Sequence, residues 1–303
     1  MRHFKGLVAP TFTPMSSDGS LDLSPIERLA ESHLADGICG AFVCGSTGES
    51  TSLTVDERKQ VAERWQTVAG AELPVIVHVG HNALPAAKEM AAHAQRIGAA
   101  AVAAMAPCYF RPSDVEDLVV WCSEIASAAP GLPFYYYHIP SRTGVYVKLA
   151  EFLARGCERI PNLAGAKFTF EDLFDLGQCL DLDDGRFEML FGRDEMLLAG
   201  YAIGVEGAVG TTYNFAAPLY HELIAAFKAG DMAAAQARQA QSREMITAML
   251  SFPGMGACKA MMGMVGVDCG PVRLPNRNLT PEQVKALRGE LEAVGFFEYC
   301  SKG

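Results

Sequence analysis

The chain alternates short apolar runs with longer stretches of mixed polarity. The apolar runs cover residues 6–13, 40–45, 74–80, 100–107, 133–140, 163–169, 188–192 and 207–214. Most positions in each run are apolar, a pattern typical of strands that are buried on both faces of a parallel sheet. We therefore predict eight parallel strands within residues 1–214.

The stretches between these runs are predicted to form helices, and several begin with a recognisable signal. Ser24, Thr54 and Ser113 each stand three positions before a glutamate, which is the spacing of a capping box. Pro25 suits the first position of a helix, and Gly98 suits the end of a helix over residues 84–97. Further helices are expected over residues 147–155, 170–180, 194–203 and 216–229.

Eight strands that are each followed by a helix predict an α/β fold, the (β/α)8 TIM barrel, whose usual length is ~250 residues. A doubly wound sheet is the alternative, but the G-x-G-x-x-G motif does not follow the first run. After residue 230 we find helical patterns over 232–250, 255–265 and 281–294, the last with a capping box at Thr280. We expect residues 1–230 to form a catalytic barrel and residues 231–303 to form a helical appendage packed on it.

Composition restricts the partners and the compartment. The 303 residues are 50% hydrophobic and carry a formal net charge of −10, which disfavours binding to nucleic acid or to anionic membranes. No apolar run approaches the roughly 18 residues of a membrane span, and no apolar segment of a signal peptide follows Met1. The nine cysteines include no C-x-x-C pair, which favours reduced thiols and a cytoplasmic protein.

Polar residues stand at the C-terminal ends of the predicted strands, where a barrel places its active site. Among them, Lys167 interrupts the apolar run 163–169. A buried ammonium group is unfavourable unless it is paired or loses its proton, and a neutral amine attacks ketones to form a Schiff base. The alternative is a lysine at a strand end whose head lies in water. The polar residues at the other strand ends favour the catalytic interpretation.

Two other strand ends supply groups that such a lysine would need. Tyr137 ends the fifth run, which neighbours the sixth in a barrel, so its phenol could exchange protons beside Lys167. The second run ends in Gly-Ser-Thr-Gly-Glu at 45–49, where the hydroxyls of Ser46 and Thr47 could bind a carboxylate. A plain tight turn explains this loop equally well. Glu49 is expected to brace the loop rather than to catalyse.

The seventh and eighth strand ends suggest a site for hydroxyl groups. Asp194, Glu195 and Thr211 stand there, and the two carboxylates would oppose the phosphate that many barrels bind at these strands. The dipole of a helix that begins at residue 194 is an alternative reason for the two acidic residues. Arg142 is the cation expected at the mouth, with surface solvation as its alternative. The sequence has no H-E-x-x-H motif, and we expect neither a metal nor an organic cofactor.

These strand ends together resemble the N-acetylneuraminate lyase and dihydrodipicolinate synthase family of pyruvate-dependent class I aldolases. The resemblance covers nearly the whole chain and rests on Gly-Ser-Thr-Gly-Glu at 45–49, Tyr-His-Ile-Pro at 137–140, Gly-Ala-Lys at 165–167 and Gly-Thr-Thr-Tyr-Asn at 210–214. It implies that Lys167 forms the Schiff base, that Tyr137 shuttles the proton, and that Ser46 and Thr47 hold the keto-acid carboxylate. It also implies a homotetramer in which Ser46 links Tyr137 to Tyr109 of a neighbouring subunit.

Within this family, most features favour the lyase branch. Ser46 followed by threonine, three tyrosines before His138, and Phe-Gly-Arg-Asp-Glu at 191–195 are similar to the sialic acid lyases. The resemblance then implies that the sugar hydroxyls are bound by Thr169, Gly192, Asp194, Glu195 and Thr211, although lyases usually have serine at the last position. Arg142 departs from the lyase pattern, because the synthases carry an arginine there to bind the carboxylate of aspartate semialdehyde.

We therefore expect aldol cleavage of N-acetylneuraminate to N-acetylmannosamine and pyruvate. Three alternatives stay open: condensation of pyruvate with aspartate semialdehyde, an aldolase or dehydratase for another 2-keto-3-deoxy sugar acid, and a catalytically silent protein that binds sugar acids. The joint presence of Lys167, Tyr137 and Ser46 argues against the silent protein.

Overall fold

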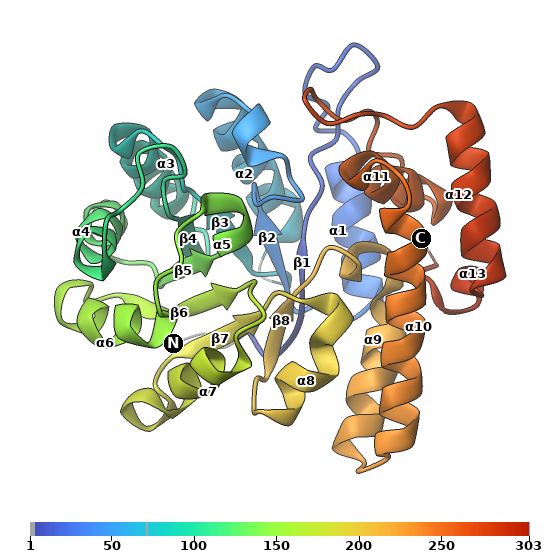
Figure 1. The fold of residues 1–303 in the computed structure, drawn as a ribbon. Helices are drawn as coiled ribbons and strands as arrows, with labels where there is room; N and C mark the ends of the chain where they lie inside the picture. The colour runs from blue at the N-terminus through green and yellow to red at the C-terminus, as the bar shows by residue number, and fades with distance from the viewer. Residues whose placement is uncertain (1–3, 71, 303) are drawn as a thin grey trace.

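A computed structural model describes residues 4–70 and 72–302. Eight parallel strands close into a barrel in the order in which they occur in the chain, with β8 bonded back to β1 (Figure 1). The strands are β1 (Gly6–Pro10), β2 (Gly40–Val43), β3 (Val75–His78), β4 (Ala101–Met105), β5 (Phe134–His138), β6 (Leu163–Phe168), β7 (Glu188–Phe191) and β8 (Gly207–Val209). This arrangement confirms the predicted TIM barrel, with a strand at each of the eight apolar runs.

Side chains on the two faces of the strands fill two separate cores. One set lies inside the barrel and includes Val8, Phe42, Ile76, Tyr135 and Leu190. The other set packs between the strands and the surrounding helices. A strand that is buried on both faces needs apolar residues at successive positions, and this requirement explains the unbroken apolar runs in the sequence.

An irregular register in the sheet decides which residues face each other near the top of β6. The pairing of β5 with β6 shifts near the start of β5, and beyond the shift Tyr137 lies opposite Lys167. Gly165 allows β6 to approach β7, because a Cβ atom at this position would lie 1.9 Å from the carbonyl oxygen of Glu188. The lysine and the tyrosine therefore occupy matching positions at the C-terminal ends of neighbouring strands.

Helices follow the strands and surround the barrel, as predicted (Figure 1). Those of the barrel are α1 (Ile26–Ala35), α2 (Val55–Ala69), α3 (Leu84–Arg96), α4 (Val115–Ala126), α5 (Pro140–Thr143), α6 (Leu149–Arg159), α7 (Leu173–Asp181), α8 (Leu197–Ala202) and α9 (Tyr213–Lys228). Three short 3-10 turns are η1 (Ser50–Ser52), η2 (Leu182–Gly185) and η3 (Asp194–Met196). The sequence pattern does not indicate α5, which has four residues.

Helix starts follow the sequence signals only in part. Thr54 and Thr280 form the predicted capping boxes. The prediction for Ser24 is wrong, because its hydroxyl donates to the carboxylate two residues before it and α1 has no side-chain cap. At α4 the capping residue is Asp114 rather than Ser113, since the aspartate carboxylate accepts a backbone N–H of the first turn. Spacing alone therefore does not decide which polar residue caps a helix.

Four helices follow the barrel: α10 (Met232–Leu250), α11 (Gly254–Met264), α12 (Pro281–Ala293) and α13 (Phe296–Tyr299). The first three are close to the predicted ranges, and α10 packs along α9 (Figure 1). The segment between α11 and α12 lies beside the segment after β1, where the N–H of Met15 donates to the carbonyl oxygen of Cys269 at 3.1 Å. The C-terminal region thus reaches the end of the barrel at which the strands finish.

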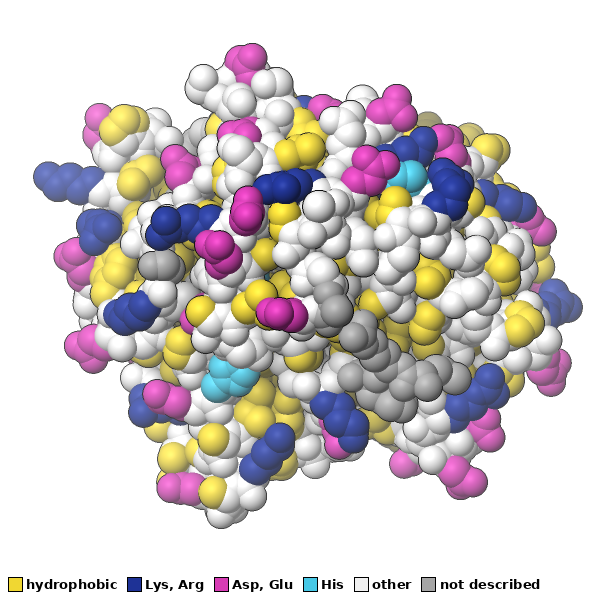
Figure 2. Space-filling view, turned by 180° about the vertical axis from the view of Figure 1, so that it is seen from behind, with side chains coloured by type: hydrophobic (Ala, Val, Ile, Leu, Met, Phe, Trp, Pro, Cys, Tyr) yellow, Lys and Arg dark blue, Asp and Glu magenta, His cyan; other side chains and the backbone are white. Residues whose placement is uncertain are grey.

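In the part of the chain that the structure describes, the helices, the surface charges and the cysteines show no special feature of the fold beyond the barrel. Within residues 4–70 and 72–302, no helix is both long and apolar enough to cross a membrane. On the face drawn in Figure 2, basic and acidic side chains are interspersed rather than gathered by sign. All nine cysteines are free thiols.

Candidate active site

Lys167 lies inside the barrel rather than in water. Its residue is 4% exposed, and it stands near the C-terminal end of β6. The Nζ atom is 4.3 Å from the ring centroid of Phe42 and 4.3 Å from that of Tyr137. An amine that is enclosed by aromatic rings is shielded from solvent, which is the environment in which a lysine can serve as a nucleophile.

Tyr137 connects the lysine to the loop after β2. Its hydroxyl lies 3.3 Å from Oγ of Ser46. Its ring packs edge-on against Phe42 and His78, with centroid separations of 5.6 and 5.7 Å. The neighbouring Tyr136 points to the other side of the sheet, where it packs on an outer helix. The phenol is therefore held beside Lys167, with a second hydroxyl within reach to pass a proton.

The loop at residues 45–49 is tightly folded and needs its glycines. A Cβ atom on Gly45 would lie 2.8 Å from the ring of Phe42, and one on Gly48 would lie 3.1 Å from a backbone oxygen. Glu49 has a left-handed backbone with φ 54°, a conformation that residues other than glycine rarely adopt. Such a conformation persists only where the surroundings hold it. The packing around the loop must therefore hold it in this shape.

Thr47 and Thr211 bring the second and eighth strand ends together. Their Oγ1 atoms are 2.8 Å apart, so one hydroxyl donates to the other. Ser46 faces Tyr137 on the other side of the same loop. The hydroxyls of residues 46 and 47 are therefore held in place by partners on β5 and after β8. They form the edge of the site to which a carboxylate of the substrate could bind.

Thr169 and Gly192 form a close contact at the ends of β6 and β7. A Cβ atom on Gly192 would lie 2.0 Å from Oγ1 of Thr169, so no larger residue fits there. The threonine hydroxyl is buried and has no hydrogen-bond partner among the described residues. A buried hydroxyl without a partner is unfavourable, and this one is available to a ligand.

Asp194 and Glu195 differ in what their carboxylates contact. Asp194 is buried and accepts both the backbone N–H of Thr212, at 2.9 Å, and its hydroxyl, at 2.6 Å. Glu195 lies 3.3 Å from Nε of Arg193, and burial together with the charge of Asp194 raises the pKa of the Glu195 carboxyl. Arg193 also pairs with Glu171. Asp194 is thus tied to the loop after β8, whereas Glu195 belongs to a charged cluster after β7.

Three predicted site residues are exposed: Ser46, Arg142 and Tyr109. Arg142 lies on the surface of α5, directly after the strand that carries Tyr137. Tyr109 is 78% exposed and packs edge-on against Phe110, which is 86% exposed. One copy of the chain therefore leaves two aromatic side chains of the β4–α4 connection uncovered.

Sequence reasoning missed the buried pair of His78 and Arg58 beside Tyr137. Nδ1 of His78 donates to the carbonyl oxygen of Cys44 at 2.9 Å, and Arg58 donates to the carbonyl oxygens of His78 and Gly80 at 2.6 and 2.9 Å. Burial, and then the charge of Arg58, holds the pKa of His78 well below its usual value, so the ring is neutral. A polar residue at the end of an apolar run was the available signal, as it was for Lys167.

The described residues contain no group of three or more His, Cys, Asp or Glu side chains arranged to hold a metal ion. What the site does contain is a buried amine, a phenol and several hydroxyls, gathered at the ends of β2, β5, β6 and β8. Such groups suit proton transfer and covalent catalysis by the amine.

Comparison with known proteins identifies the family. The model of the dihydrodipicolinate synthetase family matches residues 3–294. The chain belongs to this family. The N-acetylneuraminate lyase of Rattus norvegicus is 38% identical over 303 residues, covering 98% of this chain and 95% of the relative. The resemblance seen in the sequence motifs is thereby confirmed.

Two solved structures are closely similar to this chain. The N-acetylneuraminate lyase of Proteus mirabilis has a TM-score of 0.95 at 38% identity and covers 97% of this chain and 100% of its own. The N-acetylneuraminate lyase (sialic acid aldolase) of Aliivibrio salmonicida also has a TM-score of 0.95 at 38% identity, with 98% of each chain covered. Both likenesses extend through the C-terminal helices.

Proposed function

We propose that this protein is an N-acetylneuraminate lyase, a class I aldolase that cleaves sialic acid to N-acetylmannosamine and pyruvate. The observation that carries the proposal is the amine of Lys167, enclosed beside the ring of Tyr137, whose hydroxyl lies 3.3 Å from Ser46. The printed names of relatives at 38% identity over nearly the whole chain support the choice of substrate.

The mechanism begins with the open-chain sugar acid, whose carboxylate binds the hydroxyls of Ser46 and Thr47. The neutral amine of Lys167 attacks C2, and the C2 hydroxyl takes a proton from Tyr137 and leaves as water to give an iminium ion. The electron pair of the C3–C4 bond flows into this iminium ion, while Tyr137 accepts the proton of the C4 hydroxyl. N-acetylmannosamine leaves, C3 of the enamine gains a proton, and hydrolysis releases pyruvate and the free lysine.

The sugar portion would lie over the ends of β6, β7 and β8. The unpartnered hydroxyl of Thr169 is the group best prepared to bind it. Glu195 faces Arg193 and could exchange part of that contact for sugar hydroxyls. We propose that Gly192, Asp194 and Thr211 also bind the sugar; Asp194 and Thr211 in addition hydrogen-bond within the chain.

We further propose a homotetramer in the cytoplasm. The exposed pair of Tyr109 and Phe110 supports an interface, since large aromatic side chains are costly to leave in water. In the assembly, Tyr109 would reach the neighbouring site through Ser46. Nine free thiols suit a reducing compartment. We also propose that residues 1–230 are the catalytic barrel and that residues 231–303 support it.

The experiment that tests the chemistry is borohydride reduction in the presence of pyruvate. We expect a covalent adduct on the peptide that contains Lys167, and release of pyruvate when N-acetylneuraminate is supplied. Lys167→Ala should abolish both, a loss of at least ~10³-fold in activity, because the nucleophile is removed. Labelling of another residue, or no labelling, would overturn the mechanism.

Dihydrodipicolinate synthase is a second candidate, and Arg142 is the observation that favours it. The guanidinium group is exposed on α5, directly after the strand of Tyr137, where it could bind a second carboxylate. Condensation of pyruvate with aspartate semialdehyde, lost in Arg142→Ala, would select this activity. A panel of 2-keto-3-deoxy sugar acids would detect a related aldolase, and binding without turnover would indicate a silent protein.

A further inference from the structure

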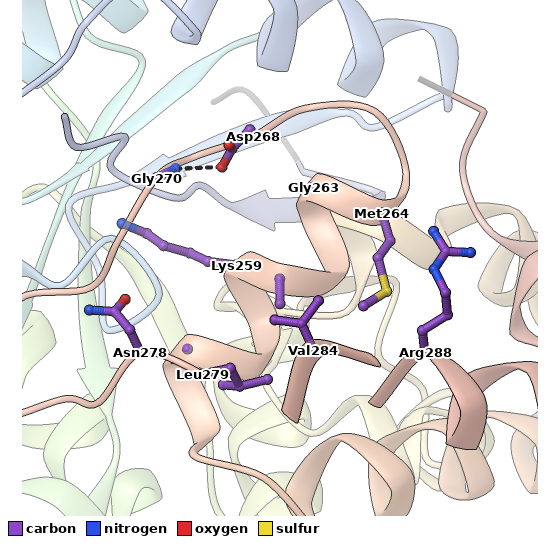
Figure 3. A pocket seen from close by; sticks show the side chains of 11 residues that line it. Lys259, Gly263, Met264, Asp268, Gly270, Asn278, Leu279, Val284 and Arg288 are labelled. Atoms are coloured by element: carbon purple, nitrogen blue, oxygen red, sulfur yellow. Dashed lines mark hydrogen bonds between the residues drawn. The ribbon is translucent and has the colours of Figure 1, made fainter. Parts of the chain in front are cut away.

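A buried ion pair joins the C-terminal helices to the loop that follows β2. Nζ of Lys259, on α11, lies 3.0 Å from Oε1 of Glu49, and the two side chains are 3% and 1% exposed. Lys259 lines a pocket of about 430 Å³ between α11 and α12, yet Figure 3 shows its ammonium group pointing away from Met264 and Arg288. The lysine therefore serves the barrel rather than the pocket.

The ammonium group of Lys259 has a full set of partners. It donates to the carbonyl oxygen of Thr13 at 2.8 Å and to that of Pro271 at 2.7 Å. The hydroxyl of Thr13 in turn donates to the carbonyl oxygen of Gly48 at 2.8 Å. Lys259 thus contacts the loop at residues 45–49 directly through Glu49 and indirectly through Thr13.

Glu49 is fixed on its other side as well. Its Oε2 atom accepts the backbone N–H of Arg273 at 3.0 Å, and its own N–H donates to the carbonyl oxygen of Ser46 at 3.1 Å. The left-handed backbone of Glu49 is unfavourable for a residue other than glycine, and the surroundings must hold it. Glu49 follows Ser46 and Thr47 within one turn, so all three side chains share a short segment of backbone.

We propose that Lys259 is a positioning residue, which holds Glu49 so that the hydroxyls of Ser46 and Thr47 keep the geometry that binds the substrate carboxylate. This inference rests on the proposed function, because it assumes that the loop binds that carboxylate. A buried ion pair is weak evidence for stability, since apolar replacements are often tolerated. Removing one partner alone leaves a buried charge unpaired, so the test must separate carboxylate recognition from stability.

The test compares two ketones that differ at one group, a carboxylate in one and a neutral amide in the other. Borohydride trapping on Lys167 is measured against the concentration of pyruvate and of pyruvamide, its neutral amide. In Lys259→Met we expect the half-saturating pyruvate concentration to rise at least about tenfold, the scale of one weakened hydrogen bond to a charged group. The value for pyruvamide and the limiting rate of trapping should change little. Lys285→Met, on the exposed side of α12, is the matched control.

Two further variants separate positioning from folding. Glu49→Gln/Lys259→Met removes both charges, so no carboxylate is left buried and unpaired. We expect it to fold and to keep the pyruvate defect. Glu49→Gln alone, which retains an acceptor for Arg273, should show a smaller defect of the same kind.

The possible outcomes distinguish the two proposals. A wild-type protein that forms no adduct on Lys167 would overturn the proposed function, and this inference with it. If the wild type is trapped but the folded double variant has wild-type preference for pyruvate over pyruvamide, only the positioning role fails. An equal loss for both ketones would also overturn the positioning role, since a general loss of structure would affect both.

Discussion

The two sides of the barrel mouth differ in how firmly they are held. The loop after β2 is buried apart from Ser46, and it is fixed by Lys259, by Arg273 and by the hydroxyl of Thr13. Farther around the mouth, the β4–α4 connection exposes Tyr109 and Phe110, and α5 exposes Arg142. The loop that is expected to bind the carboxylate is therefore held within one chain, whereas this second side presents surfaces that a substrate or a second subunit would have to cover.

This difference suggests that the two sides bind different parts of the substrate. The keto-acid end of a substrate needs the same carboxylate and carbonyl contacts whatever the rest of that substrate is. A loop that already holds the binding geometry lowers the free-energy cost of binding this end. The leaving sugar or a condensing aldehyde varies between family members. An exposed rim can change its side chains with little effect on the packed core, because surface substitutions usually alter stability by less than about 0.5 kcal/mol.

The largest effect that sharpens this comparison is expected at Tyr137. Tyr137→Phe keeps the ring beside Lys167 and removes the proton carrier, so activity should fall by about 10²- to 10⁴-fold. The free energy of unfolding should change little, because the hydroxyl contacts Ser46 at a long 3.3 Å. Steady-state rates and urea unfolding of the same preparations measure both quantities. A variant with near wild-type rates would show that the phenol does not move the proton.

A smaller effect is expected at Thr47, on the firmly held side. Thr47→Val keeps the shape and removes the hydroxyl that pairs with Thr211 at 2.8 Å. Losing one hydrogen bond to a charged group costs about 1.5–3 kcal/mol, so KM for the keto acid should rise by about tenfold or more. The limiting rate should fall less. Equal effects on pyruvate and on pyruvamide would contradict a role in carboxylate binding.

The sequence was sufficient to predict the barrel and to single out Lys167 as the candidate nucleophile. Strands buried on both faces leave unbroken apolar runs, and a charged residue inside such a run, Lys167, stands out without any neighbour being known. The family motifs added the roles of Tyr137 and Ser46. Their meeting in space follows from the barrel itself, because adjacent parallel strands place their C-terminal ends together.

The supports of the site could not be predicted in the same way. Lys259 meets Glu49 across 210 positions of sequence, and nothing in the local pattern of either residue names the other. His78 was visible as a polar residue in an apolar run, but its partner Arg58 lies on a helix with ordinary polar composition. Long-range polar pairs depend on packing, which the periodicity of a single sequence does not encode.

On the exposed side, Tyr109 offers a test with an effect on activity but not on the fold. Tyr109→Ala should leave the free energy of unfolding of the chain within about 0.5 kcal/mol, because the side chain is 78% exposed. If it completes a neighbouring site, the turnover rate should fall several-fold, and light scattering should show weaker assembly. Phe174→Ala, which removes an aromatic ring that is 73% exposed on α7, is the control. If Tyr109→Ala keeps the wild-type turnover rate and the wild-type mass of the assembly, Tyr109 neither completes a neighbouring site nor supports the assembly.

The smallest effect concerns acid stability of the firmly held side. Two hydrogen bonds from the guanidinium group of Arg273, at 2.6 and 2.8 Å, lower the pKa of the Glu57 carboxyl to about 2. The unfolded chain titrates near the ordinary value of about 4.5, so between these limits it binds more protons than the folded protein. Stability from this pair is therefore full above about pH 4.5 and is lost as the pH falls toward 2.

We expect Arg273→Met to destabilise the protein more at pH 7 than at pH 3, by about 0.5–1 kcal/mol in urea unfolding, because solvent screens part of the interaction. Lys148→Met removes an ion pair with Asp172 in which the lysine is 58% exposed, and should show a much smaller difference, because solvent screens such pairs. Equal pH dependence in the two variants would mean that the ion pair of Arg273 with Glu57 stabilises the fold no more than a surface pair does. The firmer hold on the loop after β2 would then come from packing and not from this ion pair.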